Sequence, residues 1–134
     1  MYLTKISVKD SMIEGKGVFS LEDIKKDSVV WKFDSTHDKS LSPSEFDKLD
    51  TESKTALLRV AYLSEKSNQY IYPPEEDPAR FTNHSETNNL SVVSNESISE
   101  EPIFVANRDI KMGGELTVNY TEFDTQPNKS HVWD

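Results

Sequence analysis

The order of apolar and polar residues predicts a mainly β protein that is interrupted by one helical segment. Apolar and polar residues alternate over residues 4–9, and a second alternation covers residues 29–33. A period of two places one set of side chains on a core and the other in solvent. The expected inward sets are Thr4, Ile6 and Val8 in the first strand and Val29, Trp31 and Phe33 in the second, with Val30 and Lys32 on the opposite face.

Short apolar runs predict further strands at residues 70–72, 90–93, 103–106 and 115–120. Valine, isoleucine and aromatic residues dominate these runs, and polar or proline-containing segments separate them. The sequence therefore predicts about seven or eight short strands. The polar tail, residues 121–134, contains Phe123, Val132 and Trp133 and is expected to fold back onto the domain.

One segment carries clear helical signals. Ser42-Pro43-Ser44-Glu45 combines an N-cap serine, a proline at the first helical position and a glutamate at N3, which is a capping box. A first helix is expected to end at Leu49, and Asp50 or Thr51 can cap a second. The broad apolar face expected for that second helix consists of Leu57, Leu58, Val60, Ala61 and Tyr62. These elements predict a helical insert over about residues 35–78, which ends in the prolines Pro73, Pro74 and Pro78.

A short pattern occurs twice. Asp-Ile-Lys begins at residue 23 and again at residue 109, and each copy is followed by a turn and a strand. Asp27 stands where the second copy has Gly113, and aspartate is one of the few residues other than glycine that tolerate a left-handed turn position. The repeat predicts two similar β-turn-β corners.

Composition and charge restrict the possible functions. The chain has 134 residues, a net charge of −9 and no cysteine, so a single domain without disulfides or thiolate metal sites is expected. The acidic balance argues against nucleic acid as a partner and suits a cationic one, although a solvated acidic surface is the commoner cause. The histidines at 37, 84 and 131 show no ligand spacing, so we expect no metal. No apolar run resembles a signal peptide or a membrane span, so an intracellular protein that does not contact membranes is expected.

Two segments offer polar chemistry. Glu14-Gly15-Lys16-Gly17-Val18-Phe19-Ser20 contains two of the four glycines, which permit either an ordinary turn or the close approach of a ligand to main-chain N–H groups. The second segment, residues 79–89, has no periodicity and gathers arginine, histidine, amide and hydroxyl side chains. By itself it is equally well explained as a surface loop or as a binding loop.

Three separated motifs together resemble SET-domain protein-lysine methyltransferases of the small stand-alone type, which lacks flanking zinc-binding cysteine clusters. They are the glycine segment, Arg80-Phe81-Thr82-Asn83-His84-Ser85 with Asn89, and Gly114-Glu115-Leu116-Thr117-Val118-Asn119-Tyr120. The resemblance implies a β-clip fold with a C-terminal pseudoknot. It also implies methyl transfer from S-adenosylmethionine to a lysine side chain of a protein or peptide substrate.

The resemblance also implies roles for single residues. The expected cofactor-binding residues are Lys16, Gly17, Val18, Arg80, Phe81, Asn83 and His84; the expected catalytic residue is Tyr120, and Phe33 and Val118 are expected at the substrate channel. Ser85 and Asn89 are expected to hold the chain crossing together. Glu86, Asn88 and Asn119 depart from residues that are common in the family.

The sequence leaves two alternatives open. A catalytically silent SET domain could bind a basic peptide or a protein partner without turnover. A nucleotide-binding βα unit could be built on the glycine segment, but the third glycine of that motif and a following helix are both missing from the sequence.

Overall fold

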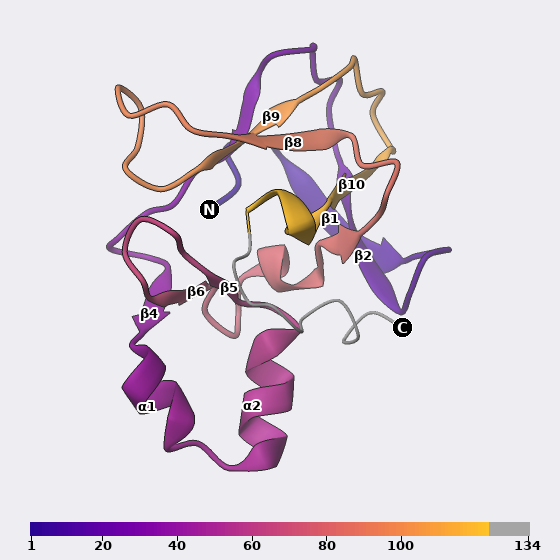
Figure 1. The fold of residues 1–134 in the computed structure, drawn as a ribbon. Helices are drawn as coiled ribbons and strands as arrows, with labels where there is room; N and C mark the ends of the chain where they lie inside the picture. Colours follow the sequence, from indigo (N-terminus) through magenta and orange to yellow (C-terminus); the bar gives the residue numbers. More distant parts are fainter. Residues whose placement is uncertain (124–134) are drawn as a thin grey trace.

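A computed structural model describes residues 1–123 and contains three small sheets and two short helices (Figure 1). The strands are β1 (Ile6–Asp10), β2 (Lys16–Ser20), β3 (Val29–Trp31), β4 (Lys39–Leu41), β5 (Tyr62–Leu63), β6 (Tyr70–Tyr72), β7 (Asn83–His84), β8 (Leu90–Val93), β9 (Ile103–Ala106) and β10 (Glu115–Val118). The helices are α1 (Pro43–Asp47) and α2 (Thr51–Leu58), with 3₁₀ helices η1 (Pro78–Phe81) and η2 (Tyr120–Glu122). The mainly β fold with a helical insert is therefore confirmed. The strands exceed the expected number because several of them are only two or three residues long.

The first sheet brings distant parts of the chain together in the order β1-β2-β10-β7. β10 is antiparallel to β2 but parallel to β7, with Thr117 opposite Asn83 and Val118 opposite His84. A late strand thus lies between an early one and the short strand of the 79–89 loop. This arrangement is the pseudoknot that the motifs predicted. The glycine segment lies in an antiparallel hairpin, so the nucleotide-binding βα alternative is wrong.

The second sheet has the order β3-β9-β8 and forms one wall of the main core. Its register shifts between Val29 and Trp31, so the strand does not alternate as the sequence predicted. Val30 and Trp31 are both buried, and the Trp31 ring stacks on Phe104 at 4.5 Å between centroids. A bulge turns neighbouring side chains to the same face, which a period of two cannot anticipate.

The third sheet, β4-β6-β5, carries the helices at one end of the molecule (Figure 1). Both predicted caps are present: Ser42 and Glu45 form the capping box of α1, and Asp50 caps α2. The apolar face expected on α2 is wrong, because the helix ends at Leu58 and buries no residue. The apolar run continues past the helix into β5, where Tyr62 reaches the main core.

The two Asp-Ile-Lys copies form paired corners. Ile24 and Ile110 lie opposite each other in an antiparallel bridge. Each copy's aspartate accepts a hydrogen bond from the other corner: Asp109 from the Lys26 N–H and Asp23 from the Met112 N–H, both at 2.8 Å. Left-handed backbone occurs at the two predicted positions, with φ of 74° at Asp27 and 93° at Gly113. Within residues 1–123, no helix is long and apolar enough to cross a membrane.

Candidate functional site

A surface depression, here called the polar hollow, contains five of the seven residues that the motifs predicted to bind the cofactor. Its volume is about 290 Å³. Its walls come from the β1–β2 turn, the end of α2 and the segment that runs from η1 into β7. The lining residues are Glu14, Gly15, Lys16, Ala56, Arg59, Val60, Arg80, Phe81, Thr82, Asn83 and His84. The pseudoknot therefore joins the glycine segment and the 79–89 loop in one site.

Asn83 links the elements around the polar hollow. Its side-chain N–H group donates to the Lys16 carbonyl at 3.1 Å and to the Glu115 carboxylate at 2.9 Å. β7 pairs with β10, and the Asn83 side chain reaches the start of β2. The contact joins residues 67 positions apart in the sequence. Asn83 thus orients the main chain at Lys16, which lines the hollow.

Gly17 has a structural role that the sequence did not indicate. A Cβ atom at this buried position would collide with the Glu115 carboxylate and would lie 3.0 Å from Ser11 Cβ. Ser11 Oγ donates to the same carboxylate at 2.8 Å. Gly17 therefore makes room for the carboxylate that holds Asn83. The positive φ that glycine permits occurs instead at Gly15, where it is 46°.

His84 joins the polar hollow to Tyr120. Its Nδ1 accepts a hydrogen bond from the Tyr120 main-chain N–H at 3.2 Å, and the two rings are nearly parallel with centroids 6.4 Å apart. Nδ1 must be deprotonated to accept this bond. Burial lowers the pKa of His84, and the Glu86 carboxylate acts in the opposite direction. The hydrogen bond accepted by Nδ1 and the lowered pKa of His84 both favour the neutral imidazole near pH 7.

Arg80 and Phe81 line the polar hollow from its exposed side. The Arg80 guanidinium donates to the Glu75 carbonyl at 3.2 Å and lies 5.5 Å from the centre of the Phe81 ring. Across the hollow, Arg59 at the end of α2 forms an ion pair with Glu14 at 3.8 Å. Exposed pairs at such distances contribute little stability, so this edge of the hollow can rearrange easily.

Tyr120 is buried and faces a second space, here called the aromatic cavity. The cavity has a volume of about 30 Å³. Its lining residues are Trp31, Val60, Tyr62, Ile71, Tyr72, Pro73, Ala79, Thr82, Phe104, Tyr120 and Phe123. The Phe123 ring lies 5.0 Å from Tyr120 between centroids, so the described start of the tail packs into the core. Val132 and Trp133 lie outside the described residues.

The polar hollow and the aromatic cavity share a wall. Val60 and Thr82 line both spaces. The Thr82 hydroxyl is hydrogen-bonded to the Tyr2 hydroxyl at 2.7 Å, which fixes the segment between the two spaces. The polar hollow and the aromatic cavity therefore adjoin each other at Val60 and Thr82.

A third depression, here called the acidic hollow, borders the aromatic cavity. Its volume is about 370 Å³, and its walls include Phe33, Glu100 and Glu101. Ile71 lines both the acidic hollow and the aromatic cavity. Glu101 is buried and accepts a hydrogen bond from the Tyr62 hydroxyl at 3.0 Å. Burial and the Glu101 charge raise the pKa of Tyr62, which keeps its hydroxyl a donor.

Four predicted site residues line neither the polar hollow nor the aromatic cavity: Gly17, Val18, Phe33 and Val118. Val18 and Val118 are buried in the main core, and Phe33 lines the acidic hollow. The main-chain groups of Val18 pair with β1 and β10 in the first sheet. Glu115 and Thr82, which the sequence reasoning did not assign, are central to the site. One feature of the sequence could have indicated a role for Glu115: it places a carboxylate at the start of a predicted buried strand.

The fold and the site define a β-clip domain in which a C-terminal strand crosses beneath a polar loop. A family model described as the SET domain matches residues 15–121, and the chain belongs to this family. No curated protein matches the chain. Similar solved structures include the crystal structure of a Plasmodium falciparum "putative histone methyltransferase", with a TM-score of 0.59 and 24% identity over 87% of this chain and 93% of that one. At this identity the likeness concerns the fold. SET domains are in general protein-lysine methyltransferases, which supports that general class for this protein.

Proposed function

We propose that this protein transfers a methyl group from S-adenosylmethionine to the side-chain amine of a lysine in a protein substrate. The observation that carries the proposal is the shared wall between the polar hollow and the aromatic cavity, formed by Val60 and Thr82. A donor and an acceptor in these two spaces would approach each other beside Tyr120. Alignment of two reactants can supply a large part of a barrier reduction.

The polar hollow suits the cofactor in size and chemistry. Its volume of about 290 Å³ is close to the lower limit of about 300 Å³ for small-molecule sites. The main chain at Lys16 and the side chains of Asn83 and His84 offer hydrogen-bonding groups, while Phe81 and the Arg80 side chain offer flat surfaces. When bound, S-adenosylmethionine supplies a methyl group that positive sulfur already activates. Gly17 and Val18 contribute to the hollow indirectly, through Glu115 and the sheet.

The walls of the aromatic cavity suit a lysine amine that must lose its proton, and its volume of about 30 Å³ must increase to admit the side chain. The pKa of a free lysine is near 10.4, so deprotonation at pH 7 costs about 5 kcal/mol. Apolar and aromatic walls disfavour the charged amine and reduce that cost. Tyr120 lies between His84 and Phe123, where its ring and hydroxyl are suited to position the amine. A tyrosine hydroxyl is in general a poor general base at neutral pH, so a positioning role is assigned to it.

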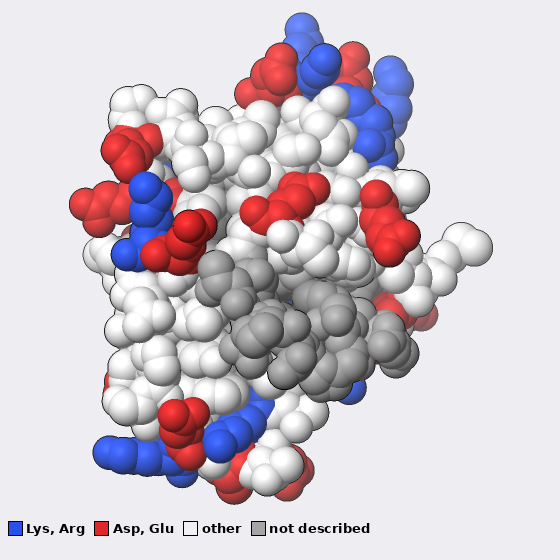
Figure 2. Space-filling view, viewed as in Figure 1, with Lys and Arg blue, Asp and Glu red and all other residues white. Residues whose placement is uncertain are grey.

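The acidic hollow supports a cationic substrate. On the face shown in Figure 2, acidic side chains are interspersed with basic ones outside the grey residues, so net charge alone marks no binding surface there. Glu100 and Glu101, by contrast, line one depression beside Phe33, and Ile71 connects it to the aromatic cavity. Carboxylates at this position would attract a lysine-rich segment toward Tyr120.

The test is transfer of labelled methyl from S-adenosylmethionine to a lysine peptide library, combined with calorimetric measurement of cofactor binding. We expect both binding and transfer, with label on lysine side chains. Binding without transfer to any peptide or protein extract would favour the catalytically silent binding domain. Absence of both would overturn the proposed function.

A further inference from the structure

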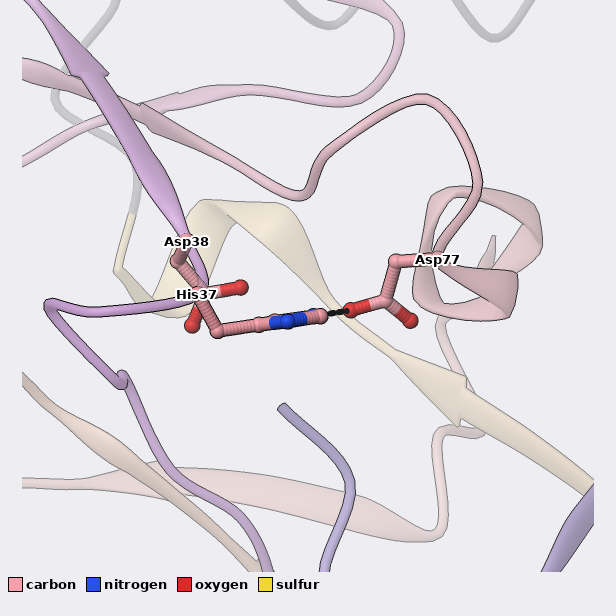
Figure 3. A group of neighbouring side chains, drawn as sticks. All are labelled: His37, Asp38 and Asp77. Carbon is pink, nitrogen blue, oxygen red and sulfur yellow. Dashed lines mark hydrogen bonds and ion pairs between the residues drawn. The ribbon is translucent and has the colours of Figure 1, made fainter.

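Three side chains that the proposed function does not use meet at the edge of the helical insert. His37 and Asp38 precede β4, and Asp77 precedes η1 (Figure 3). His37 Nε2 lies 2.6 Å from Asp77 Oδ2. One ligand atom from each of the three residues lies within 4.8 Å of the other two. We call this group the His37 cluster.

The His37 cluster differs from an ordinary acidic surface group because both of its carboxylate side chains are buried. The Asp38 and Asp77 side chains are 1% and 6% exposed, whereas the His37 side chain is 32% exposed. Asp38 Oδ1 is buried and has no hydrogen-bond partner among residues 1–123. A buried carboxylate oxygen without a partner is costly to keep, so its presence calls for an explanation.

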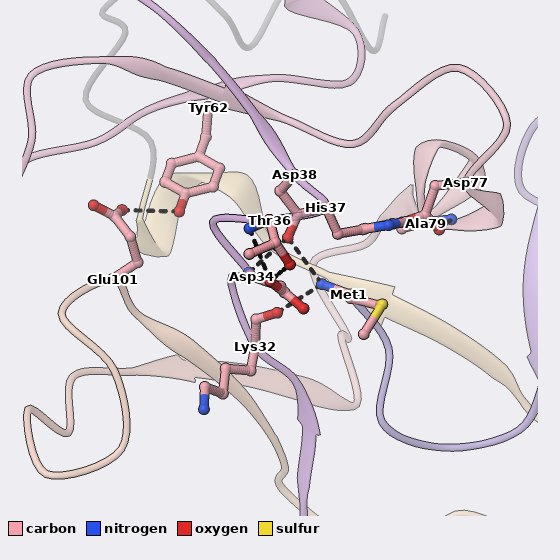
Figure 4. Close-up of polar contacts among 10 residues, drawn as sticks. All are labelled: Met1, Lys32, Asp34, Thr36, His37, Asp38, Tyr62, Asp77, Ala79 and Glu101. Atoms are coloured by element: carbon pink, nitrogen blue, oxygen red, sulfur yellow. Dashed lines mark hydrogen bonds and ion pairs between the residues drawn. The ribbon is translucent and has the colours of Figure 1, made fainter.

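The other carboxylate oxygens are already held in place. Asp38 Oδ2 accepts from the Asp34 N–H at 2.9 Å and from the Met1 ammonium at 3.2 Å (Figure 4). Asp77 Oδ1 accepts from the Ala79 N–H at 2.8 Å. These bonds fix both carboxylates, with Asp77 Oδ2 facing His37 Nε2 and Asp38 Oδ1 left for a further group. Such main-chain support is characteristic of carboxylates that bind metals.

We propose that His37, Asp38 and Asp77 bind a divalent transition-metal ion of the zinc class. One imidazole and two carboxylates form a mixed nitrogen and oxygen ligand set, which suits Zn²⁺ with water in the remaining position. The imidazole disfavours Mg²⁺ and Ca²⁺, which prefer oxygen ligands. The partly exposed His37 ring leaves a path from solvent.

A simple ion pair between His37 and Asp77 explains only part of this geometry. It accounts for their short contact, and the Met1 ammonium accounts for Asp38 Oδ2. Neither accounts for the buried Asp38 Oδ1. A cation between the two carboxylates satisfies this oxygen and reduces the repulsion between two buried negative charges.

The position of the His37 cluster indicates what the ion does. It would connect the loop before β4 to Asp77, which caps η1. η1 leads directly into Thr82 and Asn83, so the ion would brace the segment that borders the polar hollow. Its role is structural, because the described residues place it outside that hollow.

The test uses the full chain with Met1 unchanged, without a polyhistidine tag and after removal of metals with a chelator. Zn²⁺ is titrated by calorimetry and Co²⁺ by its visible absorption, which reports imidazole and carboxylate ligation. We expect one ion per chain, and a rise in Tm of about 8 °C when free Zn²⁺ is 100 times its Kd. His37→Gln and Asp38→Asn should each weaken Co²⁺ affinity at least about tenfold.

Matched variants distinguish the His37 cluster from other ligands. Glu76→Gln changes an exposed neighbouring carboxylate and His131→Gln removes another histidine, and both should retain Co²⁺ binding. Asp38→Asn decides the question if His37→Gln does not fold, as judged by circular dichroism. The proposal is overturned if the wild-type chain binds neither ion. It is also overturned if both cluster variants bind Co²⁺ as tightly as wild type, or if Mg²⁺ raises Tm as much as Zn²⁺. None of these measurements depends on methyl transfer.

Discussion

Asn89 and Thr117 hold the chain crossing by two hydrogen bonds that run in opposite directions. Thr117 N–H donates to Asn89 Oδ1 at 2.9 Å, and Asn89 N–H donates to Thr117 Oγ1 at 3.3 Å. Asn89 Nδ2 also donates to the Glu115 carbonyl at 2.7 Å. Both residues are buried. The Asn89 side chain thus satisfies two main-chain groups of β10, the Glu115 carbonyl and the Thr117 N–H.

Replacing Asn89 should therefore destabilise the protein strongly. Asn89→Ala leaves a buried N–H and a buried carbonyl without partners, and we expect a loss of about 3 kcal/mol in the free energy of unfolding. Urea denaturation measures this loss. Thr87→Ala, an exposed change in the same loop, should stay within about 0.5 kcal/mol of wild type. Equal effects of the two changes would contradict the role assigned to Asn89.

The relationship between Gly17 and Glu115 predicts an energetic coupling. Gly17→Ala should displace the Glu115 carboxylate and cost about 2 kcal/mol of stability. In a Glu115→Ala background the same change should cost less, because the colliding group is gone. Denaturation of the four proteins measures the coupling.

Gly15→Ala serves as the control for this cycle. A Cβ at Gly15 meets no atom within 4 Å, but the backbone there has φ of 46°. Its cost, about 1 kcal/mol from backbone conformation, should be the same with and without Glu115. If Gly15→Ala were coupled to Glu115→Ala as strongly as Gly17→Ala is, the collision with the Glu115 carboxylate would not be the cause of the Gly17 coupling.

Tyr120→Phe tests the site under the proposed function. Loss of the hydroxyl should lower kcat at least about tenfold, because the amine is then positioned less well. The Kd of S-adenosylmethionine should change less than about twofold, because the polar hollow does not include Tyr120. Kinetics and calorimetry separate the two effects, and equal losses in both would argue against the assigned role.

His84 predicts how stability depends on pH. Its pKa is lowered in the folded protein by burial, so the unfolded chain binds a proton more readily than the folded one. The stability contributed by neutral His84 is complete above the unfolded pKa of about 6.5 and declines as the pH falls toward the folded pKa. The stability difference between wild type and His84→Gln should therefore shrink from about pH 8 to pH 5. A difference that grows over this range would contradict the assignment.

The sequence by itself determined the features that depend on neighbouring residues. Ser42 with Glu45, and Asp50, cap their helices as predicted because a cap involves only three or four residues. Asp27 takes its left-handed conformation for the same local reason. The motifs around Asn83 and Tyr120 also indicated the family correctly, since the spacing of their residue types is visible in the chain.

Only the tertiary structure decided which distant groups meet. The bulge that buries both Val30 and Trp31 depends on the β9 strand, and the early end of α2 depends on the core that Tyr62 joins. Gly17 is required because of Glu115, and His37 meets Asp77 across 40 residues. Packing and burial determine these contacts, and local sequence patterns do not show which distant residues come into contact in the folded chain.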